Sequence, residues 1–174
     1  TQENIPARDP DSPPGIINFV VPIGELRSRG FEFDLAGEIL PNWRIIASYT
    51  FLDSEVTEGL SSVPEGNRFP NTARHSASLW SSYTIPSGSL EGLGFGLGVF
   101  FVGERPVNFA NSLFLPSYTR TDAAIYYRRD NFNFALNFRN LFDVTYFESV
   151  SSNDELQVQP GTPFSVTASL SFTF

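Results

Sequence analysis

The chain has 174 residues, with 13 glycines, 13 prolines, 18 phenylalanines and a formal net charge of −8 at pH 7. The lack of cysteine excludes a disulfide scaffold, a thiolate zinc site and a cysteine nucleophile. A single histidine, His75, argues against a histidine-ligated metal site and a Ser-His-Asp triad. The acidic balance argues against nucleic acid as a partner, because that binding depends on neutralising phosphates with basic side chains. No apolar run reaches the roughly 18 residues of a transmembrane helix.

Apolar and polar residues alternate with a period of two, which predicts β-strands with two different faces. Glycine and proline recur every few residues, so a helical interpretation fails. In the last predicted strand, six apolar residues alternate with five hydroxyl-bearing ones without interruption. The predicted strands, after the tail of an earlier one at 4–9, cover residues 31–39, 43–51, 77–85, 93–101, 119–127, 132–138 and 164–174.

Strand and loop lengths favour a membrane barrel. Most predicted strands span about nine to eleven residues, the length that a tilted strand needs to cross a bilayer core. Aromatic residues such as Trp43 and Phe51 stand at both ends of several strands, where a membrane meets water. Alternating short and long connections are typical of an all-β, antiparallel up-and-down transmembrane β-barrel with periplasmic turns and external loops. The short connections lie near 41–42, 86–91 and 129–131, and the long ones near 10–17, 57–73, 108–116 and 148–160.

Several polar residues have the parity of the face opposite the apolar one. We expect them to line the lumen, where they pair across strands or contact a plug, and we assign no catalytic residue. Trp80 shares this parity, which a plug contact or a local bulge would explain. The predicted lumen-facing or plug-facing residues are Glu32, Asp34, Trp80, Arg120, Asp122 and Arg139.

Four glycines, Gly92, Gly94, Gly96 and Gly98, alternate at the start of one predicted strand. No helix follows them, so a phosphate-binding loop would lack the helix N-terminus that it needs. We expect these inward glycines to leave room on the lumen face for something that fills the barrel.

Five segments, taken together and in this order, resemble TonB-dependent outer-membrane siderophore receptors. The first, RSRGFEFD, is similar to the family's RSRG-x-E-x-D strand, and the second, FPNTARH, to its N-x-P-x-H strand entry with Pro and Asn exchanged. YTRTD resembles Y-x-R-x-D, NLFDVTY resembles NLFD-x-x-Y, and PGTP before the final strand resembles the close of the barrel. The segments are residues 27–34, 69–75, 118–122, 140–146 and 160–163.

The resemblance implies a 22-stranded barrel, of which this chain would form the last seven to eight strands. It also implies an N-terminal plug domain and a short box that engages TonB, and neither is recognisable in residues 1–174. The sequence shows neither an initiator methionine nor a signal peptide. We therefore expect the whole chain to be a C-terminal segment of such a barrel, with Phe174 as its outer-membrane assembly signal.

The function that the resemblance implies is TonB-dependent uptake of ferric siderophores across the bacterial outer membrane, without catalysis. The expected partners are a ferric siderophore, the protein's own plug domain, TonB and outer-membrane lipid. The iron is cargo, so we expect no cofactor and no bound metal.

Aromatic platforms and cations near the loops suit an anionic or catecholate chelate. On position alone, they are the candidates for ligand contact. For His75, a rim position without a ligand is the other interpretation. The candidates are Phe109, Phe114, Tyr146, Phe147, Arg68, Arg105 and His75.

Two alternatives stay open at this point. One is an independent eight-stranded outer-membrane barrel that serves as an adhesin or structural anchor, although a lumen face rich in Gly, Ser and Ala suits a wide, plugged barrel better. The other is a soluble, lipocalin-like binder. If the chain is part of a wider barrel, its edges at 4–9 and 164–174 are unpaired, and the isolated segment should form no stable membrane barrel.

Overall fold

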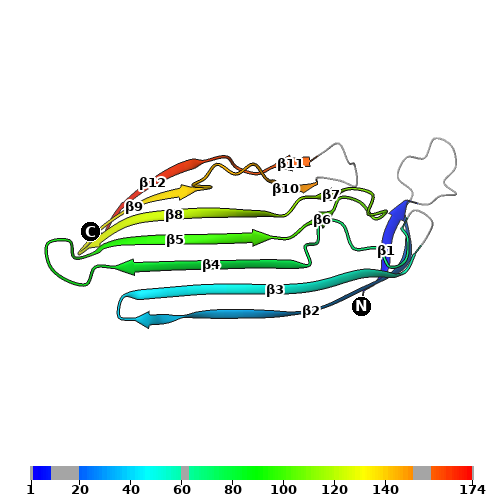
Figure 1. Cartoon of the computed structure of the whole chain (residues 1–174), viewed down its shortest axis with the longest axis horizontal. Coiled ribbons are helices and arrows are strands. Elements are labelled where there is room, and N and C mark those ends of the chain that lie inside the picture. The colour runs from blue at the N-terminus through cyan, green and yellow to red at the C-terminus, as the bar shows by residue number, and fades with distance from the viewer. Residues whose placement is uncertain (1, 9–19, 60–62, 151–157, 174) are drawn as a thin grey trace.

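The computed structural model describes residues 2–8, 20–59, 63–150 and 158–173, with side chains described from residue 24 onward. Among them, no helix is long and apolar enough to cross a membrane. Eight strands form one antiparallel sheet in which they follow one another in chain order (Figure 1). Across the sheet they are β1 (Gln2–Arg8), β2 (Val20–Leu40), β3 (Trp43–Glu58), β4 (His75–Thr84), β5 (Leu93–Val102), β8 (Tyr118–Arg129), β9 (Phe132–Arg139) and β12 (Ser165–Phe172). Two short hairpins lie outside it, formed by β6 (Arg105–Pro106) with β7 (Phe114–Leu115) and by β10 (Phe147–Val150) with β11 (Val158–Pro160).

The predicted up-and-down order of antiparallel strands is confirmed, but β2 and β3 are much longer than predicted. β2 has 21 residues and β3 has 16, and both run on toward the long loops. In this extension, Arg27 pairs with Glu55 and Ser28 with Ser54. Alternation of apolar residues marks only the part of a strand that contacts lipid, so the sequence pattern misses a polar extension whose backbone pairing continues.

Short turns and long loops lie at opposite ends of the sheet, as predicted. The turns that join β2 to β3, β4 to β5 and β8 to β9 lie at the left of Figure 1, and the loops after β3, β5 and β9 lie at the right. Asn42 and Asp130, with φ of 65° and 50°, adopt the left-handed conformation that Asn and Asp tolerate in tight turns. The predicted loop at 10–17 and the assembly signal Phe174 lie outside the described residues.

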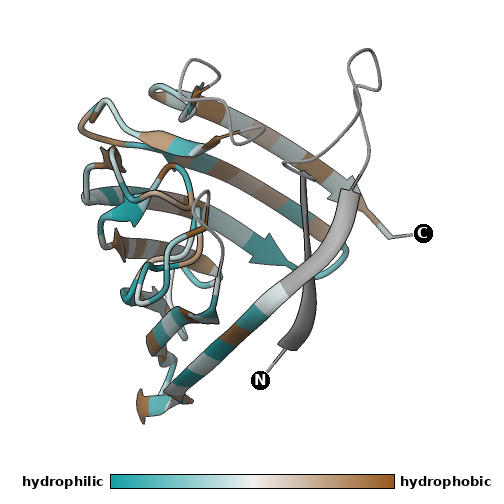
Figure 2. Ribbon diagram, turned by 90° about the vertical axis from the view of Figure 1, so that its right-hand side faces the viewer, coloured by the Kyte–Doolittle hydropathy of each residue, from teal (hydrophilic) through white to brown (hydrophobic). Residues whose placement is uncertain are grey.

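The sheet has one apolar face and one polar face, because successive side chains point in opposite directions. Phe31 lies opposite Phe51 and Phe33 opposite Tyr49, so aromatic residues gather on one side. Phe31 and Phe33 are 58% and 57% exposed. Brown and teal segments alternate along the strands in Figure 2. We call the apolar side the outer face and the polar side the inner face; an exposed apolar surface of this extent suits contact with lipid.

The sheet is open. β1 and β12 stand at its two edges, and each has one neighbour, β2 and β9 respectively. Viewed from the loop end, the strands follow an arc (Figure 2). Among the described strands the two edges do not pair, which contradicts the alternative of an independent eight-stranded barrel. The expected instability of the isolated segment stays a prediction.

Most of the buried apolar side chains gather at the loop end of the sheet, beneath the long loops. Leu26 and Val56 lie opposite each other on the inner face. Loop residues pack against them, so the loops lie over that face. The first cluster contains Leu26, Val56, Val63, Phe69 and Phe109, and the second contains Val107, Leu115, Val150, Phe147 and Val158.

Candidate functional site

The residues predicted to face the lumen lie on the inner face of the sheet. Trp80 lies opposite Gly98, and Gly98 lies opposite Asp122, so three strands contribute to one transverse row. Glu32 and Asp34 occupy positions of β2 that alternate with the outer-face aromatics. All six predicted residues have inner-face positions: Glu32, Asp34, Trp80, Arg120, Asp122 and Arg139. Their contact with a plug domain stays a prediction.

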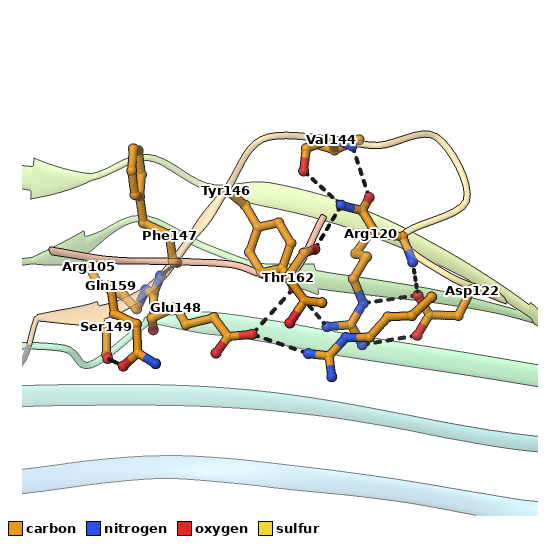
Figure 3. Close-up of polar contacts among 12 residues, drawn as sticks. Arg105, Arg120, Asp122, Val144, Tyr146, Phe147, Glu148, Ser149, Gln159 and Thr162 are labelled. Carbon is orange, nitrogen blue, oxygen red and sulfur yellow. Dashed lines mark hydrogen bonds and ion pairs between the residues drawn. The ribbon is translucent and has the colours of Figure 1, made fainter. Parts of the chain in front are cut away.

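Arg120 and Asp122 form a two-point ion pair on this face (Figure 3). Arg120 Nε donates to Asp122 Oδ1 at 3.0 Å, and Nη2 donates to Oδ2 at 3.1 Å. Their side chains are 16% and 17% exposed. Oδ1 also accepts the backbone N–H of Asn140 at 2.9 Å. Paired, charge-assisted bonds are strong, so Arg120 fixes the Asp122 carboxylate, and the bond from Asn140 to that carboxylate ties the end of β9 to β8.

Asn140 closes the turn that follows β9. It has φ of 53° and is fully buried. Its side-chain amide donates to the carbonyl oxygens of Val144 at 2.9 Å and Thr162 at 3.1 Å, and accepts the N–H of Val144 at 2.9 Å. Asp143 accepts the N–H of Phe164 at 2.8 Å. The NLFD turn therefore joins β9 to β12.

Tyr146 links this turn to the ion pair. Its ring is 2% exposed and lies 4.4 Å, between centroids, from the ring of Tyr118. Its hydroxyl accepts from Arg120 Nη1 at 3.4 Å and donates to Glu148 Oε1 at 3.3 Å, as Figure 3 shows. Glu148 in turn pairs with Arg139 at 3.1 Å. The Y-x-R-x-D and NLFD-x-x-Y segments, separate in sequence, thus form one polar network.

Arg105 is a buried cation at the edge of this network, and it is 6% exposed. Its guanidinium donates to the carbonyl oxygens of Glu148 and, at 2.6 Å, of Phe147. It also lies 5.9 Å from the ring centroid of Tyr118. Burial lowers the pKa of Arg105. The side chain ties β6 to β10 and presents little surface to a ligand.

The inner-face glycines accommodate aromatic rings of neighbouring strands. A Cβ added at Gly96 or Gly98 would collide with the indole of Trp80, and one added at Gly94 would collide with the ring of Tyr126. This corrects the expectation that the glycines leave open room for a filler of the barrel, because the wall's own side chains take that space. The strand pairing around Trp80 is regular, so no bulge explains its direction.

A hollow of about 390 Å³ lies in the inner face beside this network. It offers an indole, guanidinium groups, an amide and hydroxyls, a mixture that can hydrogen-bond and stack with polar contents of a lumen. Its lining residues include Trp80, Arg120, Asp122, Asn137, Arg139 and Thr162.

Acidic residues near the loop end of β3 are paired with arginines. Asp53 accepts from Arg74 at 2.9 Å, and Glu55 pairs with Arg27. Within residues 2–8, 20–59, 63–150 and 158–173, no group of three or more His, Cys, Asp or Glu side chains could hold a metal ion. These acids connect neighbouring strands.

Comparison with known proteins decides the family. The sequence model described as "TonB dependent receptor-like, beta-barrel" matches residues 1–141. The chain belongs to the TonB-dependent receptor family. The metal-pseudopaline receptor CntO of Pseudomonas aeruginosa (strain UCBPP-PA14) is 34% identical over 175 residues, which cover 99% of this chain and 24% of CntO. The catecholate siderophore receptor Fiu of Escherichia coli K12 is 30% identical over 157 residues, covering 86% of this chain and 20% of Fiu.

The fold agrees with solved TonB-dependent receptors. The crystal structure of the siderophore receptor PiuA from Acinetobacter baumannii superposes with a TM-score of 0.75 at 31% identity, over 88% of this chain and 22% of PiuA. The chain therefore spans about a quarter of the length of CntO and less of the others. These relatives are receptors and not enzymes, and membership of the family places the sheet in the outer membrane as barrel wall.

Three loop aromatics predicted to contact a ligand in the TonB-dependent receptor take part in packing within the protein, and their contact with a ligand stays a prediction. Phe109 meets Phe69 edge to face at 5.3 Å within the first buried cluster. Phe147 packs against the second cluster, and Tyr146 is buried in the polar network. Phe114, at 38% exposed, keeps a ring surface available to solvent.

Arg68 lies over the ring of Phe114, with its guanidinium carbon 5.9 Å from the ring centroid. It donates to the carbonyl oxygens of Thr72 and Glu104, both at 3.1 Å, and pairs with the Glu104 carboxylate at 3.4 Å. Its side chain is 11% exposed, and burial, reinforced by nearby Arg74, lowers its pKa. Arg68 therefore supports Phe114 more than it offers a free cation.

His75 lies on the outer face of the receptor wall and not toward the lumen. Its strand partner is Phe51, whose ring centroid is 5.3 Å away. Its Nδ1 shares a hydrogen bond of 2.8 Å with the Tyr49 hydroxyl. This placement belongs with the aromatic belt of a membrane interface and does not support His75 as a ligand contact.

Sequence reasoning missed the structural importance of three asparagines and one glutamate. Asn71 and Asn140 lie within the resemblance segments, so their positions were marked but their contacts were not. Asn111 and Glu148 carried no signal, because Asn111 bonds to Arg68 in another loop and Glu148 pairs with Arg139 at the end of β9. The contacts of all four residues depend on tertiary structure.

Proposed function

We propose that this chain forms part of the barrel of an outer-membrane receptor that takes up ferric siderophores or related metal chelates. The observation that carries the proposal is the difference between the two faces of the wall. The outer face exposes apolar side chains to lipid, whereas the inner face carries paired charges, hydroxyls and a polar hollow of about 390 Å³. A family of receptors that includes CntO, Fiu and PiuA supports this interpretation.

The cargo is a small metal chelate and not a resident cofactor. The names of the relatives indicate different chelates, a metal-pseudopaline complex for CntO and catecholate siderophores for Fiu. Both are polar, metal-bearing molecules that a lumen lined with arginine, amide and hydroxyl groups could hydrogen-bond. The proposed cargo is therefore a polar metal chelate.

The proposed partners follow from the same family. A plug domain would occupy the lumen and meet the inner-face set, including Glu32, Asp34 and Trp80, and TonB would supply energy from the inner membrane. The family match and the polar inner face support this arrangement.

An uptake assay with the intact receptor tests the proposal. Cells that lack their other receptors are given radiolabelled ferric catecholate or metal-pseudopaline, with and without the intact gene, in tonB⁺ and tonB⁻ backgrounds. We expect uptake of one chelate that needs both the gene and TonB. Equal uptake without TonB, or no gene-dependent uptake of either chelate, would contradict the proposal.

A further inference from the structure

Three asparagines of the loops make the same pair of hydrogen bonds. In each, the side-chain amide donates to the carbonyl oxygen and accepts the N–H of one other residue, as a neighbouring strand would. Their φ angles are 58°, 52° and 53°, all left-handed. The pairs are Asn71 with Val150, Asn111 with Arg68, and Asn140 with Val144.

Asn71 connects three loops. It lies in the loop after β3, and its own N–H donates to the carbonyl oxygen of Pro106 at 2.9 Å, in the loop after β5. Its amide donates to Val150 O and accepts from Val150 N, both at 3.1 Å, in the loop after β9. Val150 lies 79 positions farther along the chain, so this contact holds distant segments together.

Asn111 connects two of the same loops a second time. Arg68 N donates to its side-chain oxygen and its amide donates to Arg68 O, both at 2.9 Å. Beside it, the Asn67 amide donates to Phe109 O at 2.8 Å. The Arg68 guanidinium lies over the exposed ring of Phe114. By fixing the Arg68 backbone, Asn111 also supports this aromatic side chain.

Apolar packing joins the same loops. In the first buried cluster, Phe69 from the loop after β3 meets Phe109 from the loop after β5. In the second, Val107 from the loop after β5 packs with Val150 from the loop after β9. Hydrogen bonds and buried side chains therefore act on the same three segments.

We propose that Asn71 and Asn111 are positioning residues that hold these loops as one preformed unit before any ligand binds. We call this unit the clasped rim and define it as residues 63–74, 103–117 and 144–150. The part of the receptor mouth that it forms presents Phe114 in a fixed place. The link to ligand capture rests on the proposed function, whereas the clasping itself does not.

Substitutions at these asparagines can separate the role of the side-chain amide from that of the backbone conformation. A left-handed φ suits Gly and Asn and strains most other residues. Asn71→Gly therefore keeps the backbone and removes the amide, and Asn71→Asp keeps the size but removes the donor to Val150 O. Asn42→Gly is the matched control, because Asn42 has φ of 65° in the turn between β2 and β3, at the end of the wall away from the loops.

Amide hydrogen exchange in the intact, ligand-free receptor tests the clasp. In Asn71→Gly we expect about tenfold faster exchange of the backbone amides of Val107 and of residues 147–150, as well as of those around position 71, because loss of two hydrogen bonds favours local opening. Asn71→Asp should show the same pattern, and Asn42→Gly should leave all three segments unchanged. Faster exchange confined to 69–74, or no change, would overturn the proposal.

Binding separates this inference from the proposed function. The probe is ferric catecholate or metal-pseudopaline, whichever the parent receptor binds. We expect its Kd to rise several-fold in Asn111→Gly. In the parent receptor we expect the rim amides to be equally protected from exchange with and without the probe. An unchanged Kd, or protection that appears only with the probe, would contradict a preformed rim. If the parent receptor binds neither probe, the proposed function fails while the exchange result still decides the clasp.

Discussion

The wall and the clasped rim are stabilised in different ways. The wall is a regular ladder of backbone hydrogen bonds whose apolar side chains face outward, with Phe31 and Leu170 58% and 59% exposed. The rim has irregular backbone held by buried clusters and by side-chain amides that bond to the main chain. A wall of this kind tolerates many residues of the right polarity on each face, whereas the rim depends on individual residues such as Asn71.

The largest expected effect breaks the distinction between the two faces of the wall. Leu136 and Asn137 are neighbours on β9 and lie on the outer and inner face, respectively. Leu136→Arg in the intact receptor should cost about 2 to 4 kcal/mol of folding stability, because it places a charge in lipid. Asn137→Arg, at the same depth, should cost far less. Denaturant unfolding in lipid vesicles measures both, and equal losses would contradict the assignment of faces.

The next effect concerns the ion pair that ties the wall to the turn after β9. Asp122→Ala leaves Arg120 without its partner and removes the acceptor for the Asn140 N–H, so we expect a loss of about 2 to 3 kcal/mol. Asp122→Asn keeps an oxygen for Asn140 and should lose less. The midpoint temperature of heat modifiability is measured for each variant of the intact receptor. If both variants have the same midpoint as the parent, the network does not stabilise the fold.

A smaller effect tests the packing of the inner face. Gly96→Ala should destabilise the receptor by about 1 to 3 kcal/mol, because the new methyl group meets the Trp80 indole. In a Trp80→Ala background the same substitution should be nearly neutral. A double-mutant cycle of unfolding free energies measures this coupling, and additive losses would show that the ring does not occupy the glycine surface.

The smallest effect is expected at Tyr146, which joins the Y-x-R-x-D segment to the NLFD-x-x-Y segment. Tyr146→Phe removes a hydroxyl whose bonds to Arg120 and Glu148 are long, 3.4 and 3.3 Å. We expect a loss of about 0.5 to 1 kcal/mol with the ring stack on Tyr118 intact. Thermal unfolding followed by circular dichroism measures it, and a loss as large as that of Asp122→Ala would mean that the hydroxyl organises the network.

The sequence predicts the wall well, because a strand between lipid and a wet lumen must alternate with a period of two. Residues 93–101 and 132–138 are found as strands for this reason. The sequence pattern does not show the part of β2 that precedes Gly30. There the pair Arg27–Glu55 interrupts the apolar alternation, while the backbone pairing of the strands continues.

The rim is harder to predict, because its contacts join residues far apart in the chain. The partner of Asn71 lies 79 positions away, and no local pattern announces it. For His75 the sequence left two interpretations open, a ligand contact and a rim position without a ligand, and its strand register places it beside Phe51 on the outer face. Phe109 and Tyr146 were predicted from position alone, and their packing partners lie far away in the chain, so the sequence pattern does not show that packing.

A distance measurement across the clasped rim tests the account most directly. Residues 1–174 contain no cysteine, so spin labels at Glu65→Cys and Ala110→Cys, on exposed positions of two clasped loops, can report their separation in an otherwise cysteine-free intact receptor. Without ligand, we predict a single narrow distance distribution that broadens when Asn111→Gly is added. A broad or multiple distribution in the receptor that retains Asn111 would contradict a preformed rim.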